Sequence, residues 1–232
     1  MNSTNYSAEK IKTKAAGLGI DLVGIVPAER IDNYSDIWVE WEERKLKKTT
    51  DYIEGAKSVI ILGFEVQDEV YDLAVNREGS WEYVGEMMLS LRQRDLALEL
   101  KEAGMNLYTG YPMISYKYLA QLAGLGAFGK SSLIVTEEFG PQVRWRCLIT
   151  DVTLEYDDPA DWDPCGDCRA CLEACPVDAI ADYKVEPNGC LAGRHVKGEN
   201  LGSDLLSKYE PQVTENGHLM CRECQRVCPY SN

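Results

Sequence analysis

The chain has few residues that could bind metal through nitrogen or neutralise phosphate. Only two of its 232 residues are histidine, His195 and His218, and neither has a partner at ligand spacing. Asp and Glu outnumber Lys and Arg by 38 to 24, so the formal net charge is -14. Because nucleic-acid affinity comes mostly from cations that neutralise phosphates, we expect no nucleic-acid partner. We interpret the short basic run, residues 44–48, as a solvated helix end.

Long apolar segments are also missing. No stretch of the sequence is long and apolar enough to span a bilayer, and the first residues, MNSTNYSAEK, contain no apolar run that could serve as a signal peptide. We therefore expect a cytoplasmic protein with reduced thiols. Disulfide frameworks belong to small secreted domains, so they are not expected here.

Cysteine, in contrast, is abundant and ordered. Eight of the nine cysteines form the pattern Cys165-x2-Cys168-x2-Cys171-x3-Cys175-Pro176, an isolated Cys190, and Cys221-x2-Cys224-x3-Cys228-Pro229. In bacterial two-cluster ferredoxins three closely spaced thiolates bind one [4Fe–4S] cluster, and the Cys before Pro binds the other. The predicted ligands are Cys165, Cys168, Cys171 and Cys228 for the first cluster, and Cys175, Cys190, Cys221 and Cys224 for the second.

A zinc site explains this pattern less well. Structural zinc uses paired Cys or His knuckles, in which a third cysteine two residues further on and a proline after the fourth have no role. The ninth cysteine, Cys147, stands in an apolar stretch and is predicted to be a buried small hydrophobe. With two oxidised clusters the net charge becomes roughly -18. The sequence therefore indicates an electron-transfer protein.

The length suits one compact unit or two small ones. We predict a two-cluster ferredoxin-like domain at 163–232 and a preceding domain at 1–162 that is α+β or α/β with a mixed sheet. Hydrophobic periodicity predicts these elements there: helices at 11–18, 34–41, 80–103 and 119–122, and strands or extended pieces at 20–26, 58–64, 105–114, 132–136 and 143–154. The 34–41 helix would place Tyr34, Ile37, Trp38 and Trp41 on one face, and the 80–103 helix Val84, Met88 and Leu91.

Residues 124–131, Gly-Leu-Gly-Ala-Phe-Gly-Lys-Ser, match the Walker A pattern GxxxxGK[ST]. A phosphate loop needs a buried strand before it and a helix after it, so that amides and the helix dipole face the phosphates. Here a helical pattern precedes the glycines and a short β-branched run follows them. Nucleotide hydrolysis therefore remains a minor alternative.

The chain resembles the cobalamin-dependent reductases that include epoxyqueuosine reductase and the reductive dehalogenases. The resemblance covers nearly the whole chain. It rests on the two-cluster cysteines, on Gly19-Ile20-Asp21-x2-Gly24-Ile25-x-Pro27-Ala28, and on Ala123-Gly124-Leu125-Gly126-x2-Gly129-Lys130 followed by Leu133-Ile134-Val135, Phe139-Gly140, Val143-Arg144 and Leu148-Ile149-Thr150-Asp151.

This resemblance implies base-off cobalamin held by a nitroreductase-like α/β domain, ahead of the ferredoxin-like domain. The cofactor-binding candidates are Ala123, Gly124, Leu125, Gly126, Gly129 and Lys130. Glycines would let backbone amides approach the corrin and its nucleotide tail closely; the alternative is that they only form tight turns.

The chain also departs from the family pattern. Epoxyqueuosine reductases carry an acid in a D-[ST]-x-P-x2-E-R segment, and Gly110 stands where that Asp is expected. Their tRNA-binding helical tail and the twin-arginine signal of respiratory dehalogenases are not found, so a tRNA substrate is not expected. Dehalogenases use a Tyr with a Lys or Arg as proton donor, for which Tyr111, Tyr116, Lys117 and Arg144 are weak candidates; Tyr118 is nearby too.

The favoured function is a corrinoid-dependent iron–sulfur reductase. A ferredoxin or flavodoxin would supply single electrons through the two clusters to cobalamin, and the cob(I)alamin formed would reduce a small organic substrate or the corrinoid of a partner protein such as a methyltransferase. An acidic protein favours the low cluster potentials that this requires. A two-cluster electron carrier without corrin is the main alternative, and epoxyqueuosine reduction is considered less favoured.

Overall fold

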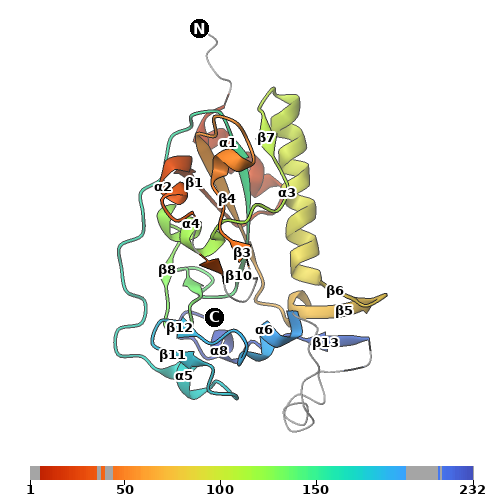
Figure 1. Cartoon of the computed structure of the whole chain (residues 1–232), viewed down its shortest axis with the longest axis vertical. Coiled ribbons are helices and arrows are strands. Elements are labelled where there is room, and N and C mark those ends of the chain that lie inside the picture. Colours follow the sequence, from red (N-terminus) through yellow and green to blue (C-terminus); the bar gives the residue numbers. More distant parts are fainter. Residues whose placement is uncertain (1–5, 36–37, 40–43, 197–213, 215, 232) are drawn as a thin grey trace. The chain divides into compact units, whose positions relative to one another are not determined.

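The computed structural model describes residues 6–35, 38–39, 44–196, 214 and 216–231. Their contacts divide the chain into two compact units, each assembled from three segments (Figure 1). Unit 1 comprises Met1–Phe64, Leu89–Ala127 and Arg144–Trp162, and unit 2 comprises Glu65–Met88, Phe128–Val143 and Asp163–Asn232. Because each unit combines segments from before and after residue 127, the units are not the domains predicted at 1–162 and 163–232, and that boundary stays a prediction.

Unit 1 is built on a four-stranded sheet. Its order is β1 (Leu22–Pro27), β4 (Ser58–Glu65), β10 (Val143–Thr150) and β7 (Leu107–Tyr108), with β1 antiparallel to β4 and β10 antiparallel to β7. The first seven residues of β4 are buried, so the strand predicted at residues 58–64 is confirmed. The helices are α1 (Ala8–Gly17), α2 (Ala28–Asp32), α3 (Val84–Glu102) and α4 (Tyr116–Leu122).

Helix α1 confirms the helix predicted at residues 11–18, but it begins three residues earlier, at Ala8, and ends at Gly17. The Ser7 hydroxyl accepts a hydrogen bond from the Lys10 amide and caps the helix. The chain leaves the helix through Gly19, at a φ of +73°, which glycine adopts without strain. Ile11 and Ala15 then join Ile20 and residues of the sheet in the unit 1 core.

The prediction of a helix at residues 34–41 is wrong for the part of this range that the structure describes. Helix α2 ends at Asp32, and Trp38–Val39 forms strand β2, paired with β3 (Arg44–Lys45). Ile37 and Trp41 lie outside the described residues. Aromatic and β-branched residues also fit a pleated ladder, so an apolar cluster this short does not distinguish helix from strand. The basic run is consequently not a helix end: it continues from β3 to the 3-10 helix Thr49–Asp51.

The long helix begins later than predicted and buries a different face. Residues 80–83 form β6 (Ser80–Tyr83), and α3 runs from Val84 to Glu102. Leu91, predicted to share one face with Val84 and Met88, is 44% exposed, whereas Leu89, Leu96 and Leu100 are buried. The buried face includes Gln93, whose side-chain amide donates to the Cys147 carbonyl at 2.9 Å. Hydrophobic periodicity did not identify this face, because the buried and hydrogen-bonded Gln93 interrupts its apolar pattern.

The remaining predicted strands are present but shorter. Of 105–114 only β7 is regular, of 132–136 only β9 (Ile134–Val135), and β10 stops at Thr150. Unit 2 also contains the sheet β13 (Gly217–Leu219), β5 (Leu73–Arg77) and β6, and the hairpin β11 (Ile180–Ala181) and β12 (Lys184–Val185). Strand β8 (Ala127–Phe128) pairs with β9. The other unit 2 elements are the 3-10 helix η3 (Glu69–Asp72), α5 (Ala170–Glu173), α6 (Leu191–Val196) and α8 (Glu223–Arg226).

A buried ion pair joins separate segments of unit 2. The Arg222 guanidinium lies 3.1 Å from the Asp72 carboxylate and donates to the Gln67 carbonyl at 2.8 Å. Asp72 and Arg222 are both buried. Breaking a buried pair leaves an uncompensated charge, so this contact ties the chain just before α8 to η3. Among the helices that the structure describes, none is long and apolar enough to cross a membrane.

Strand β1 packs tightly against the end of α4. A Cβ built on Gly24 would lie 2.5 Å from the Ala123 Cβ and 3.3 Å from the Ala123 carbonyl oxygen. Real Cβ atoms do not approach so closely, so the strand accepts only glycine at this point. Gly17, at the end of α1, has nothing within 4 Å of its Cβ position.

Replacing Gly24 with Ala should destabilise unit 1 by about 1–3 kcal/mol, because an extra methyl must displace the strand or α4. The matched replacement Gly17→Ala should leave stability unchanged or raise it by up to roughly 1 kcal/mol. Thermal unfolding followed by circular dichroism measures both. Equal melting temperatures for the two variants would contradict this packing.

Candidate metal centre

The two cysteine runs fold as a structural repeat. The segments Cys168-Arg169-x-Cys171-x3-Cys175-Pro176 and Cys221-Arg222-x-Cys224-x3-Cys228-Pro229 each place their central Cys on a one-turn helix, α5 or α8. The two helices pack against each other within unit 2. Cys190 immediately precedes α6. All nine cysteines are free thiols.

The thiols interact as two groups. Burial, and then the neighbouring Cys165, Cys168 and Cys228, raise the pKa of the Cys171 thiol. Burial also raises the pKa of Cys228, with Cys165 and Cys168 adding to the effect. The first predicted set of ligands is thus brought together.

The second group surrounds Cys224. Burial, followed by Cys221, Cys190, Cys171 and Cys175, raises the pKa of the Cys224 thiol to about 12. Three of these neighbours are the other members of the second predicted set, and Cys171 stands between the two groups. Cluster binding requires thiolates, so these half-buried thiols need the positive charge of iron to ionise.

The arrangement of the cysteine thiols differs from that of a site for a single metal ion. In the described part of the chain, no three His, Cys, Asp or Glu side chains converge closely enough to share a single metal ion. In a [4Fe–4S] cluster each iron takes its own thiolate. Cys165, Cys168, Cys171, Cys224 and Cys228 line one common recess. The chemistry of this donor set suits an iron–sulfur cluster.

The end of the glycine-rich segment contacts the first cysteine loop. The Lys130 amide donates to the Cys165 sulfur at 3.3 Å, and the Lys130 Nζ donates to the Gly166 carbonyl at 2.8 Å. A Cβ on Gly129 would lie 3.4 Å from the same sulfur and 2.8 Å from the Val135 side chain. Gly129 and Lys130 therefore position the cysteine loop.

Acidic residues complete this loop. The Asp163 carboxylate accepts from the amides of Cys165 and Gly166 at 2.9 and 3.2 Å, and from the Tyr183 hydroxyl at 2.8 Å. The Cys165 amide is the main cause of the lowered pKa of Asp163. The same hydroxyl–carboxylate bond raises the pKa of Tyr183 to about 12. The Lys130 Nζ lies 3.7 Å from the Asp182 carboxylate.

The other cofactor-binding candidates, Ala123, Gly124, Leu125 and Gly126, belong to unit 1 and follow α4. Gly124 has a φ of +70°, and a Cβ there would lie 2.5 Å from the Asp158 carbonyl oxygen. Contacts within the protein therefore explain two of the glycines, Gly124 and Gly129, without a ligand. The cobalamin role of the segment stays a prediction.

The structure also explains the Walker-like string. Helix α4 precedes the glycines, and the following residues form a turn and the short strand β9 rather than a helix. The Lys130 ammonium is bound to the Gly166 carbonyl. A phosphate loop has the opposite order of strand and helix, so the sequence match carries no nucleotide site.

The proton-donor candidates are partly grouped. The rings of Tyr111 and Tyr116 are 6.5 Å apart, and the Tyr116 hydroxyl donates to the Pro112 carbonyl. Lys117 is exposed and Arg144 is half-buried on β10. Sequence reasoning missed Arg146, which is 4% exposed and whose guanidinium lies 3.5 Å from the centre of the Tyr111 ring. Its position two residues after Arg144, on the same face of a strand, was the available signal.

The position of the missing acid is occupied by protein. A Cβ on Gly110 would lie 2.6 Å from the Tyr108 hydroxyl oxygen. The Tyr108 ring in turn packs against Tyr52, with centroids 4.8 Å apart. A carboxylate at position 110 would require Tyr108 to move.

Known proteins are similar to the cysteine-containing region and to the rest of the chain. A family profile described as a 4Fe-4S double cluster binding domain matches residues 164–231. The epoxyqueuosine reductase of Leadbetterella byssophila is 28% identical over 98% of this chain and 80% of its own length. That of Listeria monocytogenes is 32% identical over 62% of this chain and 36% of its own length.

Solved structures show the same fold. An epoxyqueuosine reductase determined with an epoxyqueuosine-modified tRNA-Tyr stem loop matches with a TM-score of 0.70 and 22% identity, over 96% of this chain and 64% of its own. A reductive dehalogenase described as B12-dependent matches with a TM-score of 0.59 and 20% identity, over 84% of this chain and 30% of its own. This chain thus spans less than two thirds of either solved protein.

The predicted resemblance and the α+β fold with a two-cluster ferredoxin-like domain are confirmed by these matches. The relatives are oxidoreductases by name. The chain is thus similar to epoxyqueuosine reductases over almost its whole length, and its residues 164–231 match a 4Fe-4S double cluster binding domain.

Proposed function

We propose that this reductase passes single electrons through two [4Fe–4S] clusters to a corrinoid bound by the domain at residues 1–162. The observation that carries the proposal is the gathering of eight free thiols around α5 and α8, in a chain related to epoxyqueuosine reductase over 98% of its length. A ferredoxin or flavodoxin is the proposed electron donor. The strongly acidic chain favours low cluster potentials, because nearby negative charge stabilises the oxidised state.

The proposed ligands are the two sets predicted from spacing. Cys165, Cys168, Cys171 and Cys228 would hold the first cluster. Cys175, Cys190, Cys221 and Cys224 would hold the second. Cys171 interacts with members of both sets, which supports an electron path from one cluster to the other through adjacent sulfur ligands.

The proposed corrinoid contacts are the backbone of Ala123, Gly124, Leu125 and Gly126. Gly124 is exposed and has no side chain, so its peptide is accessible to a large ligand. When bound and reduced, a corrinoid supplies a strong nucleophile and reductant. The likeness of fold to a dehalogenase described as B12-dependent supports this assignment. Gly129 and Lys130 would act through the first cysteine loop instead.

The substrate is proposed to be a small organic molecule or the corrinoid of a partner protein. The candidate proton donors remain Tyr111, Tyr116, Lys117 and Arg144. Of these, the rings of Tyr111 and Tyr116 lie 6.5 Å apart. The Arg146 guanidinium, 3.5 Å from the centre of the Tyr111 ring, would hold that ring in place.

A second candidate is epoxyqueuosine reduction itself. The names of the relatives favour it, and the tRNA stem loop bound to one structural relative runs against our expectation of no nucleic-acid partner. Against it stands Gly110, which supplies no carboxylate where the family pattern has an acid. Reduction of epoxyqueuosine-containing tRNA by the reconstituted protein would support this second function over the first.

The direct test is anaerobic reconstitution with iron and sulfide, followed by a cobalamin titration monitored by visible spectroscopy. We expect one base-off corrinoid per chain, and its further reduction when a low-potential donor is added. About eight irons per chain without corrinoid binding would instead identify a two-cluster electron carrier and contradict the proposal.

The ligand sets predict which variants share a phenotype. Cys165→Ala and Cys228→Ala should each disrupt the first cluster, and Cys175→Ala the second, so each lowers iron from about eight to about four per chain. Electron paramagnetic resonance of the reduced proteins should show the same surviving cluster in the first two variants and the other cluster in the third. Cys147→Ala is the control, because Cys147 is buried and outside both sets.

Matching spectra for Cys175→Ala and Cys165→Ala would contradict the exchange of the Cys-Pro ligands between clusters. Iron loss in Cys147→Ala would indicate that the effect of the other variants is general unfolding.

Lys130 should raise the potential of the first cluster selectively. Its positive charge and its amide contact to Cys165 both stabilise added negative charge at the cluster. Replacing Lys130 with Met should therefore lower the first potential and leave the second unchanged, and Lys130→Arg should restore it. Redox titration monitored by electron paramagnetic resonance measures both potentials. Lys184→Met, an exposed position on β12, is the control, and equal potentials in all four proteins would refute this role.

A further inference from the structure

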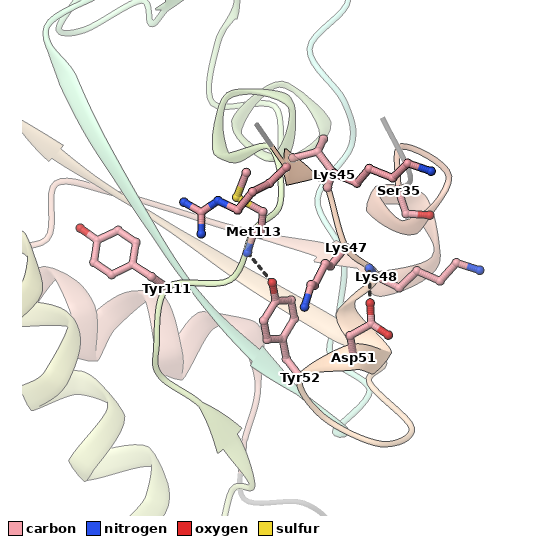
Figure 2. Close-up of a pocket in the computed structure, with 10 residues that line it drawn as sticks. Ser35, Lys45, Lys47, Lys48, Asp51, Tyr52, Tyr111 and Met113 are labelled. Carbon is pink, nitrogen blue, oxygen red and sulfur yellow. Dashed lines mark hydrogen bonds between the residues drawn. The ribbon is translucent and has the colours of Figure 1, made fainter. Parts of the chain in front are cut away.

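Unit 1 contains a basic pocket of about 670 Å³. The pocket is lined by two segments, one around β3 and the following 3-10 helix and the other before α4 (Figure 2). Figure 2 shows Tyr111 toward one end of the pocket and the lysine side chains toward the other. The lining residues used below are Arg44, Lys45, Lys47, Lys48, Tyr52 and Tyr111.

Backbone contacts fix the two segments to each other. The Lys47 amide donates to the Met113 carbonyl at 2.8 Å, and the Met113 amide donates to the Tyr52 hydroxyl at 2.5 Å. The Asp32 carboxylate accepts from the amide and the hydroxyl of Thr49 at 2.7 and 2.9 Å, which anchors the 3-10 helix. The frame that carries the basic side chains is therefore preorganised, although the side chains themselves are long and exposed.

The charge of the lining contrasts with the rest of the chain. Of the described residues that line it, four have cationic side chains and one, Asp51, has a carboxylate, which accepts a hydrogen bond from the Lys48 amide at 3.1 Å. Among the described residues, no carboxylate pairs with Lys45, Lys47 or Lys48. The chain as a whole carries -14. Gathering like charges costs free energy, and a bound anion would offset that cost.

The size and surface of the pocket select a class of anion. Its volume lies within the roughly 300–1,000 Å³ typical of small-molecule sites. Three or more cations suit a phosphate dianion better than a single carboxylate, and Arg and Lys are the usual phosphate-binding residues. Tyr111 is 61% exposed and offers a flat face to the organic part of a ligand.

We propose that this basic pocket binds a small organic phosphate. The site is formed within unit 1, by the 44–52 and 111–113 segments, and requires neither the clusters nor the corrinoid. Its binding can therefore fail or succeed independently of the proposed reductase function.

The test is calorimetric titration of the reconstituted 232-residue chain with phenyl phosphate, inorganic phosphate and benzoate. Phenyl phosphate should bind with a submillimolar Kd, more tightly than inorganic phosphate because of the added ring contact. Benzoate, which has the same ring but one negative charge, should bind at least tenfold more weakly. Raising the salt concentration should weaken phosphate binding.

Charge reversal identifies the site. The double variant Lys45→Glu with Lys47→Glu should lose at least tenfold in affinity for phenyl phosphate. The control, Lys101→Glu with Lys184→Glu, changes the net charge equally at exposed positions outside the pocket and should bind normally. The neutral pair Lys45→Gln with Lys47→Gln should lie between them, and provides the measurement if the reversed pair does not fold.

Three results would overturn the proposal. They are absence of phenyl phosphate binding at millimolar concentration, equal affinity in the pocket and control variants, and equal or tighter binding of benzoate. An RNA stem loop that binds through Lys45 and Lys47 while phenyl phosphate does not would identify the pocket as part of a nucleic-acid surface and would also overturn it.

Discussion

The packing of α5 against α8 is the contact on which the rest of unit 2 depends. It brings the sulfurs of both cysteine runs into one half-buried region, where partial burial and mutual repulsion of thiolates raise the pKa of Cys171, Cys224 and Cys228. Without metal, bringing these thiols together does not stabilise the fold. Iron removes the penalty, because metal binding supplies positive charge and contributes folding free energy. The helices themselves have a single turn, too short to be stable alone.

The surrounding residues hold this region in place by polar contacts. The Asp163 carboxylate accepts from an amide of the loop that begins at Cys165, and the Lys130 ammonium donates to a carbonyl of the same loop. Arg222 joins the residue before α8 to Asp72. The glycine-rich segment thus acts at both of its ends. Gly124 packs on Asp158 within unit 1, and Gly129 and Lys130 pack on the cysteine loop within unit 2.

Sequence reasoning succeeded where one physical requirement determined the residues. Cysteine spacing predicted the two-cluster domain, since cubane ligation tolerates few alternatives, and the continuous apolar run predicted β4, since a strand buried on both faces needs one. It failed at Trp38, where a short apolar cluster suits helix and strand equally, and at Leu91, because the polar Gln93 lies on the buried face of α3. Sequence reasoning also did not predict the basic pocket. Residues 44–48 lie more than 60 positions from Tyr111, and only tertiary structure brings them together.

Metal and sulfide content of the anaerobically reconstituted chain, combined with Mössbauer spectroscopy, tests the central claim most directly. Two [4Fe–4S] clusters require about eight irons and eight sulfides per chain, with all iron in mixed-valence cubane sites. One or two metal ions without sulfide, or iron in isolated tetrahedral thiolate sites, would show that α5 and α8 assemble a different centre.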